Sequence, residues 1–205
     1  MKLSPRGIVV TGGAVGLGKA NATKLASEHQ ANLILGARRV DKLEELKHTL
    51  EENYAVKCKT IAADLSDINN IERMFRESTQ NQEVYGVILN AGITYFGEHQ
   101  QLAWDQFEQL LATNVSGIIK AVELYLPYLS EKSQGGSIML VSSVAGLLPV
   151  PYQAAYSGSK AFITHYGLAL NEELRDKSVS LTVFSSGSIA TVMSLIHIFE
   201  PTRQS

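Results

Sequence analysis

The chain has 205 residues, of which 45% are hydrophobic and 19% charged, and its net charge is −2. This composition is typical of one globular domain and excludes wholesale disorder, and a slightly acidic balance gives no basic surface for nucleic acid. The single cysteine, Cys58, excludes an intrachain disulfide. No apolar run reaches the roughly 18 residues of a membrane-spanning helix, and the first residues are too polar for a secretory signal, so a cytoplasmic protein is expected.

Short apolar segments alternate with longer amphipathic ones along the whole chain. Strands are predicted at residues 7–11, 32–36, 56–62, 86–90, 137–142 and 180–184. Helices are predicted at residues 16–28, 40–53, 67–80, 104–129 and 154–176. Runs such as Ile8-Val9-Val10 lack alternation, which is typical of strands covered on both faces. We therefore expect a single α/β domain with a Rossmann-like, doubly wound parallel sheet and helices on both faces.

Several residues fit structural roles better than functional ones. Trp104, Phe107 and Leu110 recur at helical spacing, which predicts core packing. Cys58 lies on a predicted strand and is expected to be a small buried side chain. The five histidines show no metal-ligand spacing, so no metal site is predicted.

A glycine-rich turn joins the first strand to the first helix. It reads Thr11-Gly12-Gly13-Ala14-Val15-Gly16-Leu17-Gly18. Gly12 allows a tight turn, Gly16 allows backbone to approach a pyrophosphate, and Gly18 allows the helix to pack near the strand. Free N–H groups at the helix start would face the phosphates. A glycine-rich loop without a ligand is the alternative, and the strand–turn–helix context favours the phosphate site.

The Gly-x-x-x-Gly-x-Gly spacing resembles the turn of the short-chain dehydrogenase/reductase family. Four further matches follow in the family's order, from residue 7 to about residue 193. They are Ala63-Asp64-Leu65, Asn90-Ala91-Gly92, Thr113-Asn114-Val115, and Ser143 followed by Tyr156-Ser157-Gly158-Ser159-Lys160. This resemblance implies an oxidoreductase that transfers a hydride between a nicotinamide cofactor and a carbonyl or secondary alcohol.

The resemblance also implies two sets of site residues. The cofactor-binding set is Gly12, Val15, Gly16, Leu17, Gly18, Arg38, Asp64, Leu65, Asn90, Ala91, Gly92, Tyr156, Lys160, Ile189 and Thr191. The catalytic set is Asn114, Ser143, Tyr156 and Lys160.

Each catalytic residue has an expected role by this resemblance. Tyr156 is the general acid that protonates the carbonyl oxygen, or the base in the reverse direction. Lys160 lies four residues later on the same helical face, where its ammonium would favour the phenolate and hold the nicotinamide ribose. Ser143 would donate a hydrogen bond to the reacting oxygen, and Asn114 would anchor a water that links Lys160 to solvent.

The end of the second strand indicates the cofactor. Enzymes that use NAD usually carry an acidic residue there for the ribose 2′-hydroxyl, and this chain has Ala37 followed by Arg38. A guanidinium can pair with a 2′-phosphate, so NADP(H) is expected in preference to NAD(H). A solvated arginine at a helix start is the alternative. Val15 is a mild counter-signal, because many relatives that use NADP have a basic residue at that position.

The resemblance ends near residue 193. Residues 1–193 are assigned to the dinucleotide-binding domain, and residues 194–205 to a tail unlike any part of the family. The tail is either foreign sequence from an assembly junction, which we favour, or a real alternative terminus. Without the family's last helix and strand, we expect residues 181–184 to form an uncovered edge strand, and the 205-residue chain to be marginally stable and poorly active.

Other functions stay open at this point. A catalytically inactive cofactor-binding protein would keep the cleft but not the complete catalytic set. A nucleotide-sugar epimerase or dehydratase shares Tyr-x-x-x-Lys, but the glycine spacing and short length disfavour it. The apolar segment 145–153 is expected to wall the site of a partly apolar small-molecule substrate. The complete protein is expected to form a homodimer or homotetramer through helices 104–129 and 154–176.

Overall fold

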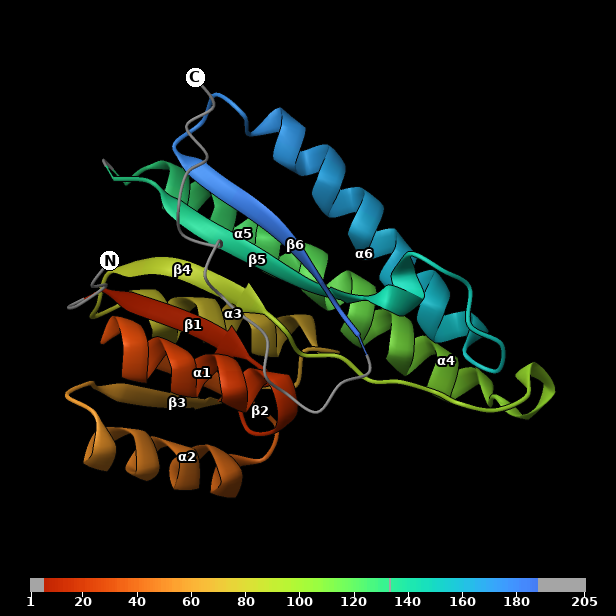
Figure 1. Ribbon diagram of the computed structural model, residues 1–205, viewed down its shortest axis with the longest axis horizontal. Helices are drawn as coiled ribbons and strands as arrows, with labels where there is room; N and C mark the ends of the chain where they lie inside the picture. Colours follow the sequence, from red (N-terminus) through yellow and green to blue (C-terminus); the bar gives the residue numbers. More distant parts are fainter. Residues whose placement is uncertain (1–5, 133, 188–205) are drawn as a thin grey trace.

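The computed structural model describes residues 6–132 and 134–187 (Figure 1). Six parallel strands form one sheet in the order β3-β2-β1-β4-β5-β6. The strands are β1 (Gly7–Thr11), β2 (Asn32–Ala37), β3 (Cys58–Ala62), β4 (Val84–Leu89), β5 (Gly136–Ser143) and β6 (Val179–Ser186). The expected α/β fold with a doubly wound parallel sheet is confirmed.

Helices cover both faces of the sheet (Figure 1). The α-helices are α1 (Gly16–His29), α2 (Val40–Asn53), α3 (Ile68–Thr79), α4 (Trp104–Leu111), α5 (Gly117–Ser130) and α6 (Ala154–Glu173). Leu25 of α1 and Leu46 of α2 pack in the core on one face. Ile71 of α3, Val122 of α5 and Ile163 of α6 pack in the core on the other. The inner strands β1, β2, β4 and β5 are therefore almost completely buried, as their apolar runs predict, whereas β3 and β6 at the two edges are only partly buried.

The prediction of one continuous helix at residues 104–129 is wrong. Residues 104–129 do not form a single α-helix, because a π-helical turn, η2 (Ala112–Ser116), separates α4 from α5. Local widening of a helix is rare and occurs mostly at functional sites. Hydrophobic periodicity does not reveal it, since both flanking segments keep their helical pattern.

The predicted core role of Trp104 is also wrong. Its side chain is 69% exposed at the start of α4, and its ring lies 5.2 Å from the half-buried Phe107. Leu110, one helical turn further on, is buried as expected. Cys58 is buried as expected too, and burial raises the pKa of its thiol to about 12.

β6 lies at one edge of the sheet. Among residues 6–132 and 134–187, its only pairing partner is β5. Val179 and Leu181 are buried on the side of α6, whereas Ser180 is exposed on the opposite side. The prediction of an edge strand therefore holds for the described part of the chain, and the predicted tail at residues 194–205 lies outside it.

Candidate active site

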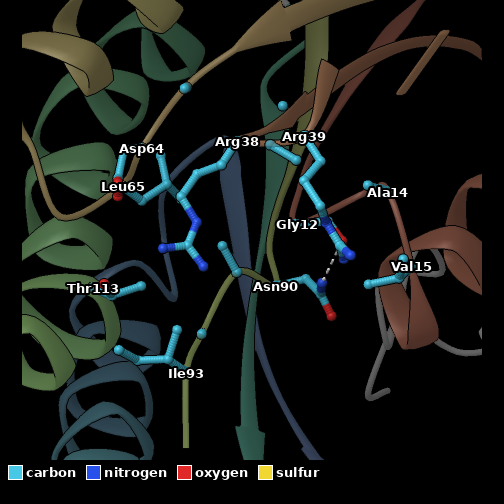
Figure 2. Close-up of a pocket in the computed structure, with 15 residues that line it drawn as sticks. Gly12, Ala14, Val15, Arg38, Arg39, Asp64, Leu65, Asn90, Ile93 and Thr113 are labelled. Carbon is cyan, nitrogen blue, oxygen red and sulfur yellow. Dashed lines mark hydrogen bonds between the residues drawn. The ribbon is translucent and has the colours of Figure 1, made fainter. Parts of the chain in front are cut away.

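A cleft of about 250 Å³ opens at the carboxyl ends of the central strands (Figure 2). The segments that follow β1, β2, β3 and β4 contribute its walls. β1 and β4 are neighbours although far apart in sequence, so the chain order reverses between them. This is the point at which doubly wound sheets bind ligands.

The glycine turn has the conformation that the sequence predicts for a phosphate site. Gly12 has φ +65° and Gly16 has φ +55°, both in the left-handed region that favours glycine. A methyl group added at Gly18 would lie 2.2 Å from the carbonyl oxygen of Gly12, so only glycine lets α1 begin this close to the strand. At Gly16, by contrast, an added methyl group would meet no atom within 4 Å. Backbone is thus open to a ligand at Gly16.

Two side chains fasten this turn to the end of β4. The Thr11 hydroxyl oxygen accepts hydrogen bonds from the backbone N–H groups of Asn90, at 3.0 Å, and Ala91, at 3.1 Å. The side-chain amide of Asn90 donates to the carbonyl oxygen of Thr11 at 3.1 Å. It also donates to the carbonyl oxygen of Gly12 at 3.4 Å (Figure 2). Sequence reasoning assigned no role to Thr11. A threonine that ends an otherwise apolar buried strand is the signal that could have revealed it.

Two arginines, not one, enter the cleft from the end of β2. Figure 2 shows the guanidinium of Arg38 on the side of Leu65 and Thr113, and that of Arg39 close to Gly12. Both residues are exposed. The sequence singled out Arg38 alone, and Arg39 doubles the positive charge at this wall.

The remaining predicted cofactor residues divide into three groups. Val15, Asp64 and Leu65 line the cleft, as do all three residues of Asn90-Ala91-Gly92. The Asp64 carboxylate accepts from the backbone N–H and the hydroxyl of Ser66, at 3.0 and 2.8 Å, which fixes its orientation after β3. Leu17 instead packs against the core beneath α1. Ile189 and Thr191 lie outside the described residues.

Asn114 is fully buried within the π-helical turn. Its side-chain oxygen accepts from the backbone N–H of Ile93 at 2.8 Å, and its amide donates to the carbonyl of Ile93 at 2.8 Å. The amide also donates to the hydroxyl of Ser159 at 3.1 Å. Asn114 therefore joins three segments: the helix pair α4–α5, the loop after β4, and α6.

Lys160 lies beside Asn114 and is 4% exposed. Its ammonium donates to the carbonyl of Val141 at 2.9 Å, and burial lowers its pKa to about 8. A methyl group added at Gly92 would lie 3.2 Å from the Asn114 side-chain oxygen and 3.4 Å from the Lys160 ammonium nitrogen. Gly92, which lines the cleft, therefore packs closely against both of these buried groups, and a side chain at this position would crowd them.

Tyr156 and Ser143 lie on the two elements that hold Lys160. Tyr156 is half-buried one turn earlier on α6, and its ring centroid is 5.9 Å from the Lys160 ammonium nitrogen. Ser143, also half-buried, ends β5, and its hydroxyl oxygen accepts from the backbone N–H of Ala145 at 3.2 Å. The neighbouring Ser142 hydroxyl donates to the carbonyl of Lys160 at 3.0 Å, which ties β5 to α6.

Across 6–132 and 134–187, no three metal-ligating side chains cluster where they could hold an ion. No helix in this part of the chain has the length and apolar character needed to cross a membrane.

The glycine turn and the two arginines fit a dinucleotide. Open space at Gly16, backbone N–H groups at the start of α1 and two guanidinium groups in the cleft are the donors that phosphates require. The buried ammonium of Lys160 and the phenol of Tyr156 lie at the carboxyl end of β5, on the same side of the sheet's strand ends as the glycine turn. A carbonyl group could be protonated there.

Comparison with known proteins agrees with this geometry. The family model for short chain dehydrogenases matches residues 6–196. The very-long-chain 3-oxoacyl-CoA reductase of Neurospora crassa is 35% identical over 193 residues, which are 92% of this chain and 57% of that protein. The 17-beta-hydroxysteroid dehydrogenase type 3 of Mus musculus is 30% identical over 188 residues, covering 91% of this chain and 61% of that protein.

A solved structure shows the same fold with a bound cofactor analogue. The alcohol dehydrogenase of the archaeon Thermococcus sibiricus, complexed with 5-hydroxy-NADP, superimposes with a TM-score of 0.83 at 26% identity. The match covers 91% of this chain and 77% of the archaeal one. The chain spans about three fifths of the length of the curated relatives described above. With its fold, its ordered motifs and these relatives, the chain belongs to the short-chain dehydrogenase family of oxidoreductases.

Proposed function

We propose that this chain is the catalytic part of an NADP-dependent carbonyl reductase with Tyr156 as general acid. The single observation that carries the proposal is the grouping of Tyr156, Lys160 and Asn114 at the sheet edge that also holds the glycine turn. NADPH supplies the hydride when bound. The protein's own groups then have to hold the substrate carbonyl and deliver a proton to its oxygen.

Proton delivery begins at the Tyr156 hydroxyl. As negative charge develops on the carbonyl oxygen, the phenol donates its proton there, and the nearby Lys160 ammonium stabilises the phenolate that remains. The Ser143 hydroxyl donates a hydrogen bond to the same oxygen. Lys160 is buried and its pKa is lowered to about 8, so this ammonium can itself release a proton near neutral pH. In the reverse direction Tyr156 takes up the proton of an alcohol.

Preference for NADPH is proposed from the two arginines. Arg38 and Arg39 both reach the cleft wall at the end of β2, and neither Ala37 nor any other residue at that strand end is acidic. A charged hydrogen bond contributes about 1.5–3 kcal/mol, so a 2′-phosphate paired with one arginine would favour NADPH over NADH by about tenfold or more. The archaeal structural relative, which holds an NADP derivative, supports the same choice.

The substrate is proposed to be a ketone with a large apolar portion. The curated relatives are named for very-long-chain 3-oxoacyl-CoA and for 17-beta-hydroxysteroids. Leu147 and Leu148, in the segment between β5 and α6, are 58% and 64% exposed, so this segment presents apolar side chains at the surface.

A homodimer is proposed from the exposed apolar side chains of the long helices. Trp104 on α4 and Phe162 and Leu168 on α6 are all more than half exposed. Pairing of these helices with those of a second copy would cover them. Sedimentation velocity should show a dimer that Trp104→Ser and Phe162→Ser together convert to a monomer. A wild-type monomer would refute this part of the proposal.

The test of the main proposal separates cofactor binding from catalysis. Purified chain is titrated with NADPH and with NADH while nicotinamide fluorescence is followed, and ketone reduction is measured at 340 nm. We expect tighter binding of NADPH, a loss of that preference in the Arg38→Ala, Arg39→Ala double variant, and a loss of reduction by about 10²–10⁴-fold in Tyr156→Phe with binding retained. Equal binding of the two cofactors would refute the NADPH preference. Full activity of Tyr156→Phe would refute the assigned acid.

A further inference from the structure

A second hollow, of about 390 Å³, lies beside the start of α6. Tyr95, Gly97 and Leu102 line it from the segment after β4, and Tyr152, Ala154 and Ala155 line it from the segment that enters α6. The short helix η1 (His99–Gln101) adds polar side chains to the wall. None of these residues lines the cofactor cleft.

The two segments are fastened to each other at this hollow. The backbone N–H of Gly97 donates to the carbonyl of Tyr152 at 2.9 Å. The side-chain amide of Gln153 donates to the Thr94 hydroxyl at 3.4 Å. The rings of Phe96 and Tyr152 lie with their centroids 5.9 Å apart and their planes inclined at 40°. Residues more than fifty positions apart in sequence thus form one aromatic edge.

The rings of Phe96 and Tyr152 are both exposed to solvent. Phe96 is 71% exposed and Tyr152 is 58% exposed. Tyr152 also has φ +64°, a left-handed conformation that costs a non-glycine residue about 1 kcal/mol. An exposed aromatic ring on a strained backbone position does not stabilise the fold, and strain of this kind is concentrated at ligand sites.

The hollow adjoins the proposed reaction centre along both segments. Gly92 and Ile93 line the cofactor cleft, and the same segment reaches the hollow at Tyr95 and Gly97. On the other side, Tyr152 precedes the proposed acid Tyr156 by four residues, and Ala155 in the wall is its direct neighbour. A substrate whose carbonyl lies at Tyr156 would therefore pass its remaining part along this hollow.

We propose that Phe96 and Tyr152 form an aromatic clamp for the hydrocarbon portion of the ketone substrate. This inference rests on the proposed reductase function and names the residues that set its substrate range. Tyr152 lines the hollow and the ring of Phe96 packs against it from outside the lining, while Glu98, His99 and Gln100 make up the polar part of the wall. The two rings favour a hydrocarbon at their side of the hollow, because rings contribute large contact areas at little entropic cost. The clamp should make substrate affinity depend on the length of the hydrocarbon, and it should have no effect on the affinity for the cofactor.

The test uses ligand binding, so it does not depend on turnover. The 205-residue chain, with and without NADPH, is titrated with 2-decanone and with acetone, and saturation-transfer difference NMR detects which ligand protons touch the protein. We expect 2-decanone to bind with transfer strongest at its chain methylenes, and acetone to bind far more weakly. Phe96→Ser and Tyr152→Gly should each weaken 2-decanone binding by about five- to tenfold, since each removes much of the apolar contact.

Two features make the variants specific. Glycine accepts the positive φ of Tyr152, so Tyr152→Gly removes the ring and relieves the backbone without unfolding the loop. Ile68→Ser, at an apolar side chain at the start of α3 that is 52% exposed, serves as the control and should leave 2-decanone binding unchanged. Tyr152→Phe keeps the ring and should bind like the wild type.

Other outcomes distinguish the clamp from the proposed reaction. Unchanged 2-decanone affinity in both variants, or no binding by the wild type, refutes it and leaves the reductase proposal standing on its own test. If Phe96→Ser instead changes the sedimentation coefficient from dimer to monomer, the rings belong to an interface between two copies. A chain that binds 2-decanone through the clamp but reduces no ketone would refute the proposed reaction and retain the binding site.

Discussion

The glycine turn at residues 12–18 and the clamp of Phe96 and Tyr152 border the same edge of the sheet, yet different contacts hold them. The turn is fixed by backbone and by the buried hydrogen bonds of Thr11 and Asn90. The clamp consists of exposed rings on two segments joined by a backbone hydrogen bond and one long side-chain contact. Changes at the turn should therefore alter stability and cofactor binding together, whereas changes at the clamp should alter substrate choice alone.

The largest effect is expected at Gly18. In Gly18→Ala the new methyl group would lie 2.2 Å from the Gly12 carbonyl oxygen and 2.7 Å from the Asn90 amide nitrogen, so α1 must move away from the strand. We expect a loss of about 3 kcal/mol in the free energy of unfolding, with NADPH binding abolished. Urea unfolding and fluorescence titration measure the two effects.

Gly16→Ala is the matched control for this prediction. Its methyl group would enter open space, and only the positive φ opposes it, at about 1 kcal/mol. Equal destabilisation by the two variants would show that steric closeness at Gly18 is not what fixes the turn.

The next largest effect is expected at Asn114, which lies between the two regions. Asn114→Ala leaves the backbone N–H and carbonyl of Ile93 without their partners, and each unsatisfied group costs about 1–3 kcal/mol. We expect about 2 kcal/mol of lost stability by urea unfolding. Asn69→Ala, at an exposed asparagine of α3, should change stability by less than about 0.5 kcal/mol. A similar small change at Asn114 would contradict its role as a connection between helix and loop.

An effect of similar size and opposite sign is expected at Lys160. Burial lowers its pKa to about 8, below the 10.5 of a free lysine, so at pH 7 the folded protein holds a charge that burial disfavours. The folded protein releases this proton between pH 8 and 10.5 while the unfolded chain still binds it, so the contribution of Lys160 to stability rises with pH across that window.

Lys160→Met should therefore stabilise the unliganded chain at pH 7 by about 2 kcal/mol, and less at pH 10. Urea unfolding at both pH values measures the difference. A stabilisation that is the same at pH 7 and pH 10 would mean that the ammonium is not the cause. Activity should be lost in this variant at either pH.

The smallest effect on stability is expected at the clamp. Phe96→Ser removes a ring that is 71% exposed, so the free energy of unfolding should change by less than about 0.5 kcal/mol and NADPH binding should not change. Thermal unfolding with and without NADPH checks both statements. A loss as large as that of Asn114→Ala would show that the clamp supports the fold, and the contrast between the two regions would fail.

This contrast also explains which features the sequence predicts. Steric contacts require glycine at positions 12 and 18, so the turn follows from residue type and spacing. The apolar runs predict the strands of the sheet, and the order of the elements predicts that β6 lies at its edge. The π-helical turn at Asn114 arises from tertiary contacts with Ile93 and Ser159, which no local pattern records. Trp104 and Phe96 are exposed because no other element of the described chain covers their side chains. Helical spacing or aromatic character alone cannot reveal such a tertiary property.

The sheet order bears on how the chain is made. Thr11 at the end of β1 donates its hydroxyl proton to the carbonyl of Ile88, 77 residues later, so one edge of the central strand has no partner until β4 leaves the ribosome. At 5–20 residues per second that wait is on the order of 4–15 seconds. Until then a buried, apolar strand offers an open edge to other nascent chains. Soluble yield in cells should therefore depend on translation speed and on chaperones that shield this edge.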